Sequence, residues 1–191
     1  MKLLSILIFF CWIPVSYGVT NKTTDKQVTE TYISAKVIRE NARRVTLKLR
    51  SRAAIIYDER ENENIIERNA HEVMPIASLS KLMTAMVILD SELDMDDEIT
   101  INKQDKDRLR YSRSRLRKGM KFTRRDLLLI ALMASENRAA SALARTYPGG
   151  TVDFVKAMNA KAIALGLSNT RFADSAGLSN DNVSTAQELM K

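Results

Sequence analysis

The sequence has one cysteine, Cys11, and one histidine, His71, among its 191 residues. Because Cys11 lies in an apolar N-terminal stretch, the rest of the chain has no thiol for a disulfide or for nucleophilic catalysis. One histidine without cysteines cannot build a typical zinc site, and His71 lies in a polar stretch where a Ser-His-Asp triad is not expected. The sequence also lacks a Gly-x-x-x-x-Gly-Lys phosphate loop. We therefore predict no metal and no cofactor.

Long apolar runs are equally scarce. The one candidate covers residues 3–13, and about eleven residues fall short of the roughly 20 that a membrane-spanning helix needs. Lys2 precedes this run and Ser16-Tyr17-Gly18 follows it, which is the pattern of a secretory signal with its cleavage site. We predict that residues 1–18 are removed, that the chain is exported across the inner membrane to the periplasm, and that the mature chain has no integral membrane segment.

Positive charge exceeds negative charge, with 30 Lys and Arg against 23 Asp and Glu and a formal net charge of +7. Such an excess suits polyanions, and export argues against nucleic acid as the partner. The basic residues concentrate in residues 103–125, where Asp105 and Asp107 are the only acidic ones. Tyr111 and Phe122 are too few aromatics for a base-stacking platform. Of a polyanion-binding face and a solvated surface loop, we favour a solvated face that can also attract the carboxylates of a cell wall.

The order of polar and apolar segments predicts a polar arm over residues 19–50 and one domain over residues 51–191. Only two strands are expected, both early, at residues 53–57 and 65–67, and a polar hairpin connection joins them. Helices are expected at residues 78–89, 127–133, 138–146 and 151–165, with Thr123 and Thr151 as capping residues. Ser184 with Gln187 indicates one more helix start.

Two short motifs carry candidate chemistry. Ser78 and Lys81 are three residues apart, so on a helix the amine can reach the hydroxyl. Ser135 and Asn137 add a second hydroxyl and an amide between two predicted helices. Each motif is short enough to arise by chance. A surface lysine and a simple helix-end and N-cap pair are the structural alternatives, and the apolar neighbours of Lys81 argue against the first.

Longer stretches resemble the low-molecular-mass penicillin-binding proteins, and among them the D-alanyl-D-alanine endopeptidases. They are residues 75–85 (PIASLSKLMTA), 112–116 (SRSRL), 123–128 (TRRDLL), 131–140 (ALMASENRAA), 147–150 (YPGG) and 182–186 (NVSTA). The resemblance implies an α+β fold like that of β-lactamases and DD-peptidases, in which a helical cluster packs on an antiparallel sheet. It implies peptidoglycan peptides as substrates and β-lactams as acylating inhibitors. Whether a carboxypeptidase or an endopeptidase reaction is preferred stays open.

The same resemblance implies roles for single residues. Ser78 would form an acyl-enzyme with a D-alanyl carbonyl, and Lys81 would act as its base. That base must be a neutral amine, which burial and neighbouring positive charge would favour. Ser135 would relay the proton to the leaving amine, and Asn137 would bind the substrate's amide backbone or Lys81.

A third motif of this family, Lys-Thr-Gly or Lys-Ser-Gly, is absent, because none of the six glycines follows such a pair. We therefore expect a C-terminally truncated member that lacks the last strands of the sheet, with doubtful catalysis. The alternative function is a non-catalytic remnant that at most binds cell wall. A β-lactamase is disfavoured because no Glu-x-x-Leu-Asn pattern occurs.

Overall fold

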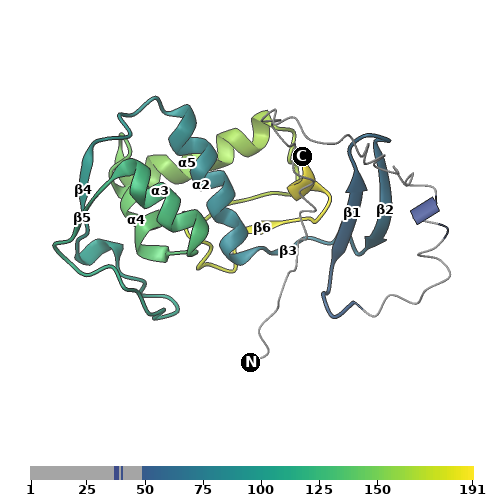
Figure 1. Cartoon of the computed structure of the whole chain (residues 1–191), viewed down its shortest axis with the longest axis horizontal. Coiled ribbons are helices and arrows are strands. Elements are labelled where there is room, and N and C mark those ends of the chain that lie inside the picture. Colours follow the sequence, from purple (N-terminus) through teal and green to yellow (C-terminus); the bar gives the residue numbers. More distant parts are fainter. Residues whose placement is uncertain (1–36, 39, 41–48) are drawn as a thin grey trace, which may run out of the picture. The chain divides into compact units, whose positions relative to one another are not determined.

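The computed structural model describes residues 37–38, 40 and 49–191 (Figure 1). The predicted signal at residues 1–18 and most of the predicted arm at residues 19–50 lie outside the described residues. The chain divides into two compact units, residues 1–70 and residues 71–191, and each is described by itself. Among the described residues, no helix is long and apolar enough to cross a membrane.

The first unit contains a β-hairpin. Strands β1 (Ala54–Asp58) and β2 (Glu63–Arg68) are antiparallel, with Ile56 opposite Ile66 and a register shift just after Ile56. The Asp58 carboxylate shapes the connection by accepting hydrogen bonds from two backbone N–H groups of the turn. The hairpin predicted from two apolar runs around a polar connection is confirmed.

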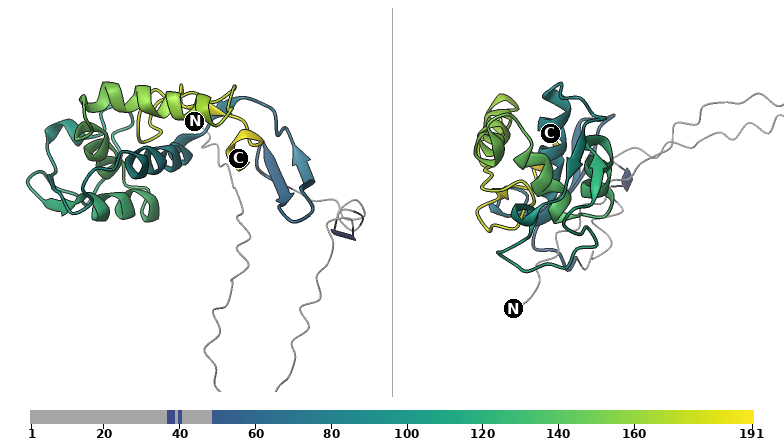
Figure 2. Two further views of the ribbon diagram at one scale, coloured as in Figure 1. Left: turned by 90° about the horizontal axis from the view of Figure 1, so that it is seen from above. Right: turned by 90° about the vertical axis from the view of Figure 1, so that its left-hand side faces the viewer.

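The second unit is built around four helices: α2 (Ser80–Asp90), α3 (Arg124–Met133), α4 (Asn137–Arg145) and α5 (Gly150–Ala164). Helix α4 contacts the other three and has no exposed residue. Figures 1 and 2 show the four helices from three sides. The inner face of α4 consists of small residues, Ala139, Ala140 and Ala144, together with Leu143, and all four are fully buried. Small side chains let the neighbouring helices approach closely, which explains why an alanine-rich helix occupies the middle of this cluster.

The core of the second unit is continuous across the helices. Its largest fully buried apolar side chains are Ile88, Ile101, Leu127, Leu143, Phe154 and Met158. Tyr147, in the turn before α5, packs edge-to-face against Phe154 with ring centroids 5.2 Å apart. This core fixes α2, and therefore the Ser78–Lys81 region at its start, against the rest of the unit.

Three 3₁₀ turns complete the helical part: η1 (Ala77–Leu79), η2 (Lys103–Asp105) and η3 (Glu188–Met190). The predicted helix start at Ser184 and Gln187 is wrong in detail. Ser184 lies in a strand, and the Thr185 hydroxyl instead accepts a hydrogen bond from the Glu188 N–H at 3.0 Å, at the start of η3.

Two further strand pairs lie in the second unit, β3 (Met74–Pro75) with β6 (Val183–Ser184), and β4 (Glu98–Thr100) with β5 (Lys121–Thr123). The expectation of only two strands, both early in the chain, is therefore wrong. Strands of two or three residues are too short to show the alternation from which strands are predicted. The α+β class is confirmed, and every sheet among the described residues has two strands.

Two predicted helix caps have different outcomes. The Thr123 hydroxyl accepts a hydrogen bond from the Asp126 N–H at 3.0 Å, as expected for a cap of α3. Thr151 does not cap α5, because the helix begins one residue earlier at Gly150. Gly149 takes the capping position with a φ of 79°, a conformation that glycine adopts without a steric penalty.

Candidate active site

Ser78 and Lys81 meet at the start of α2. Ser78 lies exposed in the 3₁₀ turn η1, one turn before Lys81, and α2 itself begins at Ser80 rather than at Ser78 as predicted. Residues three apart are eclipsed in a 3₁₀ turn, so the predicted proximity still follows. The Lys81 Nζ donates a hydrogen bond to the Ser78 Oγ over 3.0 Å. The solvent-exposed hydroxyl of Ser78 is thus hydrogen-bonded to the amine of Lys81.

Lys81 is buried, with 3% of its surface exposed, and its Nζ also donates to the Ala176 carbonyl oxygen at 2.7 Å. Burial lowers the pKa of Lys81 to about 8, while the carboxylates of Asp174 and Glu136 act in the opposite direction. Of the two effects that can favour a neutral amine, burial acts here, whereas the nearby charges are negative. Burial alone therefore makes the neutral amine accessible near physiological pH.

The backbone just before Ser78 has an unusual conformation. Ala77 has a φ of 48°, in the left-handed region that residues with a Cβ rarely adopt. Gly177 lies directly against this peptide, and a Cβ at Gly177 would stand 1.8 Å from the Ala77 carbonyl oxygen and 2.9 Å from the Ser78 nitrogen. Strained conformations persist only where the surrounding structure fixes them, and here the 173–182 segment does so.

Asn182 ties that segment to the start of α2. Its fully buried side chain donates from Nδ2 to the Ser80 Oγ and to the Asp174 carbonyl oxygen, each at 2.8 Å. Its Oδ1 accepts from the N–H groups of Ala173 and Asp174. Ser80 extends this chain of hydrogen bonds, because its Oγ donates to the Ala77 carbonyl oxygen at 2.8 Å. Every hydrogen-bonding atom of the Asn182 amide is thus used to hold the loop against the Ser78 turn.

Asp174 and Ser175 also hold the 173–182 segment in place. The Asp174 carboxylate accepts hydrogen bonds from four consecutive N–H groups, those of residues 176–179. The Ser175 carbonyl oxygen accepts from the buried Thr84 hydroxyl of α2 at 2.7 Å, and the Ser175 hydroxyl donates to the Ala140 carbonyl oxygen of α4 at 3.1 Å. These contacts place the Ala176 carbonyl where the Lys81 amine reaches it.

Ser135 lies in the connection between α3 and α4, and Asn137 lies at the start of α4. Ser135 is exposed with a φ of 52°, and within the described part of the chain its hydroxyl makes no hydrogen bond. Asn137 is the first residue of α4, and its Nδ2 donates to the Ser112 Oγ at 3.0 Å. Glu136, between them, is near enough to act on the Lys81 pKa. The structure therefore brings this loop to the same region as Lys81.

Ser112 was not predicted as a site residue. Its N–H donates to the Asp107 carboxylate, which also accepts from the N–H groups of Leu109 and Arg110. Burial raises the pKa of Asp107, but the hydrogen bonds from Arg110, Ser112 and Leu109 outweigh it and hold the pKa at about 2. The ionised Asp107 thus fixes the turn that presents Ser112 to Asn137. Among the described residues, no group of three or more metal-binding side chains converges.

Known proteins are similar in sequence over most of this chain. A D-alanyl-D-alanine endopeptidase from Pseudomonas aeruginosa is 51% identical over 144 residues, covering 75% of this chain and 46% of that protein. One from Escherichia coli is 48% identical with the same coverages. The chain spans just under half the length of these curated relatives.

Solved structures agree with the sequence relatives. A penicillin-binding protein of Listeria monocytogenes in its ampicillin-bound form superimposes with a TM-score of 0.66 at 35% identity, covering 76% of this chain and 61% of that chain. A mutant Streptomyces DD-transpeptidase superimposes with a TM-score of 0.69 at 30% identity, with coverages of 75% and 60%. The family described as D-alanyl-D-alanine carboxypeptidase matches residues 38–191. The chain therefore belongs to the D-alanyl-D-alanine carboxypeptidase family, with a penicillin-binding-protein fold.

Proposed function

We propose that this chain carries the acyl-transfer site of a serine-type D-Ala-D-Ala peptidase that acts on peptidoglycan peptides. The observation that carries the proposal is the 3.0 Å hydrogen bond between an exposed serine hydroxyl, Ser78, and a buried lysine amine, Lys81. A serine needs a neighbouring base to become a nucleophile, and a lysine with a pKa of about 8 can supply one.

In the proposed reaction, the Ser78 Oγ attacks the carbonyl carbon of a D-alanyl residue while its proton passes to the Lys81 Nζ. Ser135 relays that proton to the amine that leaves when the C–N bond breaks, which yields the acyl-enzyme. Water then cleaves the ester. The Ala176 carbonyl oxygen orients the Lys81 amine, and Asn137, held by Ser112, binds the amide backbone of the substrate.

Substrate and location are part of the same proposal. Two relatives at about half identity are named endopeptidases, which favours the cross-link between stem peptides over the free D-Ala-D-Ala end. The neighbour in its ampicillin-bound form supports β-lactams as acylating inhibitors of Ser78. The signal-like residues 1–18 support export to the periplasm, where peptidoglycan lies. N-terminal sequencing of the secreted protein should then begin at Val19.

A second candidate function of these 191 residues is cell-wall binding without catalysis. One observation favours it, namely that these residues contain no Lys-Thr-Gly or Lys-Ser-Gly triplet. In this family that triplet supplies a carboxylate anchor, and a backbone N–H just beyond it supplies half of the oxyanion hole. Losing one oxyanion donor alone costs on the order of 10²–10³ in rate.

Fluorescent penicillin distinguishes the two functions. The chain is incubated with the label, digested, and the modified peptide is identified by mass spectrometry. We expect the label on Ser78, lost in Ser78→Ala and retained in Ser141→Ala, a serine of α4 outside the site. A cooperatively melting chain that takes no label supports the non-catalytic alternative, and label that persists in Ser78→Ala contradicts the assignment of the nucleophile.

A further inference from the structure

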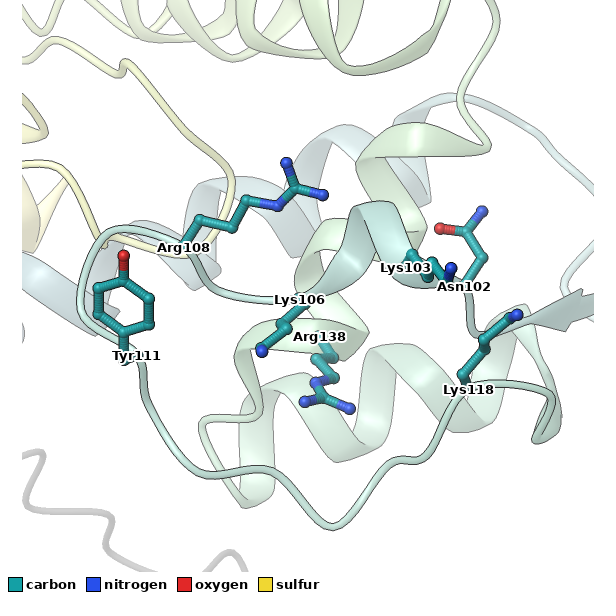
Figure 3. A pocket seen from close by; sticks show the side chains of 7 residues that line it. All are labelled: Asn102, Lys103, Lys106, Arg108, Tyr111, Lys118 and Arg138. Atoms are coloured by element: carbon teal, nitrogen blue, oxygen red, sulfur yellow. The ribbon is translucent and has the colours of Figure 1, made fainter.

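A pocket lined mainly by cations lies next to the loop that carries Asn137. It has a volume of about 380 Å³ and is drawn in Figure 3. Its lining residues are Asn102, Lys103, Lys106, Arg108, Tyr111, Lys118 and Arg138. Figure 3 shows the 106–118 segment looping around the side chain of Arg138, which comes from α4.

Five of the lining residues are cations, and their charge partners decide what the pocket can bind. Elsewhere in the second unit the basic side chains Lys121, Arg124, Arg125 and Arg145 each form an ion pair. Within the described part of the chain, none of the five pocket cations pairs with a carboxylate. Positive charge is therefore concentrated on one concave surface without compensation, which is the condition for attracting an anion.

The carboxylates of Asp105 and Asp107, the two acidic residues of the 103–118 segment, interact with groups other than the pocket cations. Asp105 is fully buried and forms an ion pair with Arg145 at 2.8 Å. Asp107 is also buried, and its carboxylate accepts the N–H groups of its own turn. Neither carboxylate is free to neutralise the pocket, although both lie next to pocket residues in the sequence.

The pocket is preformed and adjoins the proposed substrate-binding residues. Arg138 directly follows Asn137, and Tyr111 directly precedes Ser112, the partner of Asn137. The Arg138 guanidinium also donates to the Leu116 carbonyl oxygen, which fixes the loop around it. Tyr111 is 76% exposed and has a φ of 53°, a strained backbone of the kind that clusters at binding sites.

We propose that this pocket is a second anion-binding site that holds a free carboxylate of a peptidoglycan stem peptide whose backbone lies at Asn137. The assignment of the peptide rests on the proposed function, whereas the preference for an anion rests on the pocket alone. Lysine and arginine heads around a concavity recognise carboxylates by charge and hydrogen bonding. A single aromatic residue, Tyr111, gives no platform for stacked bases.

The test is a binding measurement with two matched triple variants. One, Lys106→Gln/Arg108→Gln/Lys118→Gln, removes three exposed pocket cations. The control, Arg113→Gln/Arg115→Gln/Arg117→Gln, removes three exposed cations of the same segment that do not line the pocket. The probes are a fluorescent stem tetrapeptide with free carboxylates and the same peptide with its carboxylates amidated, titrated by anisotropy at low and moderate salt.

We expect the pocket variant to bind the acidic peptide on the order of tenfold more weakly than the control variant. We expect the amidated peptide to bind both variants equally and weakly, and added salt to reduce the difference. Equal binding of the acidic peptide by both variants overturns the pocket proposal. So does pocket-dependent binding of phosphatidylglycerol vesicles in place of the peptide.

Penicillin labelling of the unsubstituted chain is measured on the same preparation and keeps the two proposals apart. If Ser78 is labelled and the acidic peptide does not distinguish the variants, the pocket proposal fails and the proposed function stands. If Ser78 is not labelled and the acidic peptide still requires the pocket cations, the catalytic proposal fails and the anion site stands.

Discussion

Gly177 lies so close to Ala77 that a Cβ built on it would stand 1.8 Å from the Ala77 carbonyl oxygen and 2.3 Å from its carbonyl carbon. Both contacts are with backbone atoms of the turn that presents Ser78. The two residues are one hundred positions apart in the sequence, and each has a positive φ, 78° at Gly177 and 48° at Ala77. The shape of the Ser78 turn therefore depends on the absence of a side chain in a distant loop.

The first prediction concerns Gly177→Ala. The methyl group cannot be accommodated without moving the Ala77–Ser78 peptide, since backbone rather than a flexible side chain stands in its way. We expect the variant to lose on the order of 2 kcal/mol or more of stability and most of its penicillin labelling. Thermal unfolding and labelling kinetics check the two effects.

Gly166→Ala is the matched control for this experiment. Gly166 also has a positive φ, 68°, but a Cβ there would meet nothing within 4 Å. The control should lose only the roughly 1 kcal/mol expected for forcing alanine into the left-handed region, and its labelling should be unchanged. Equal losses in the two variants would show that the conformation of Gly177, and not its closeness to Ala77, sets the requirement for glycine.

The second prediction concerns Asn182→Ala. Truncation removes the hydrogen bond that the Ser80 Oγ accepts and leaves the partly buried N–H groups of residues 173 and 174 without their acceptor. A net hydrogen bond contributes about 0.5–1.5 kcal/mol and Asn182 makes four, so we expect a loss of stability of several kcal/mol, visible as a lower unfolding midpoint in urea. Asn180→Ala, an exposed asparagine in the same loop, is the control and should change stability by less than about 1 kcal/mol. An unfolding midpoint for Asn182→Ala that matches the control would contradict this role.

The third prediction is a pH dependence set by Lys81. Its pKa of about 8 means that the neutral amine forms as pH rises through this value. Labelling of Ser78 should therefore accelerate about tenfold per pH unit below pH 8 and level off above it. The chemical shift of the Lys81 Cε, followed by NMR in selectively labelled protein, reports the same midpoint without relying on activity. A midpoint near the ordinary lysine value would refute the lowered pKa.

The same pKa has a consequence for stability. Between about 8 and the ordinary lysine value of 10.5, the unfolded chain holds a proton that the folded chain has released. Folding stability due to this group therefore rises with pH across that window, and the penalty for burying the ammonium is fully present below it. Lys81→Met should abolish labelling and remove this slope. The measurement is the difference in unfolding free energy between the two proteins at pH 7 and pH 10.

The fourth prediction concerns Ser112, whose Oγ accepts a hydrogen bond from the Asn137 Nδ2 at 3.0 Å. Ser112→Ala should free the Asn137 side chain and slow Ser78 labelling severalfold, while the loss of one partly buried hydrogen bond costs only about 0.5–1.5 kcal/mol. Ser112→Thr keeps a hydroxyl and should restore most of the rate. Equal labelling by the alanine and threonine variants would show that Ser112 does not position Asn137.

Local sequence patterns were sufficient for the elements and contacts that are close in the chain. The spacing of Ser78 and Lys81 predicted their hydrogen bond, and Thr123 with Asp126 predicted the start of α3. The hairpin of β1 and β2 also followed from two apolar runs and the polar residues between them. In each case the interacting residues are few positions apart, so backbone geometry alone brings them together.

The parts that sequence reasoning missed depend on contacts between distant segments. Ser80, Asn182 and Gly177 act on the Ser78 turn from two ends of the second unit, and no periodicity in the sequence connects them. The negative charges around Lys81 were not predicted, because Asp174 and Glu136 come near the amine only in the folded chain. Strands β3 to β6 were missed because two or three residues show no pattern.

The hydrogen bond from Lys81 to the Ala176 carbonyl spans 95 residues, and that from Asn182 to Ser80 spans 102. A ribosome synthesises a chain from the N-terminus to the C-terminus. Ser78 and Lys81 are therefore made before the loop that buries and orients the amine. Contacts of such long sequence separation close late in folding, because the entropy of a large loop must be lost first. Until then Ser78 is an ordinary serine beside a solvated, protonated lysine, and the reactivity of the pair exists only as a property of the folded unit.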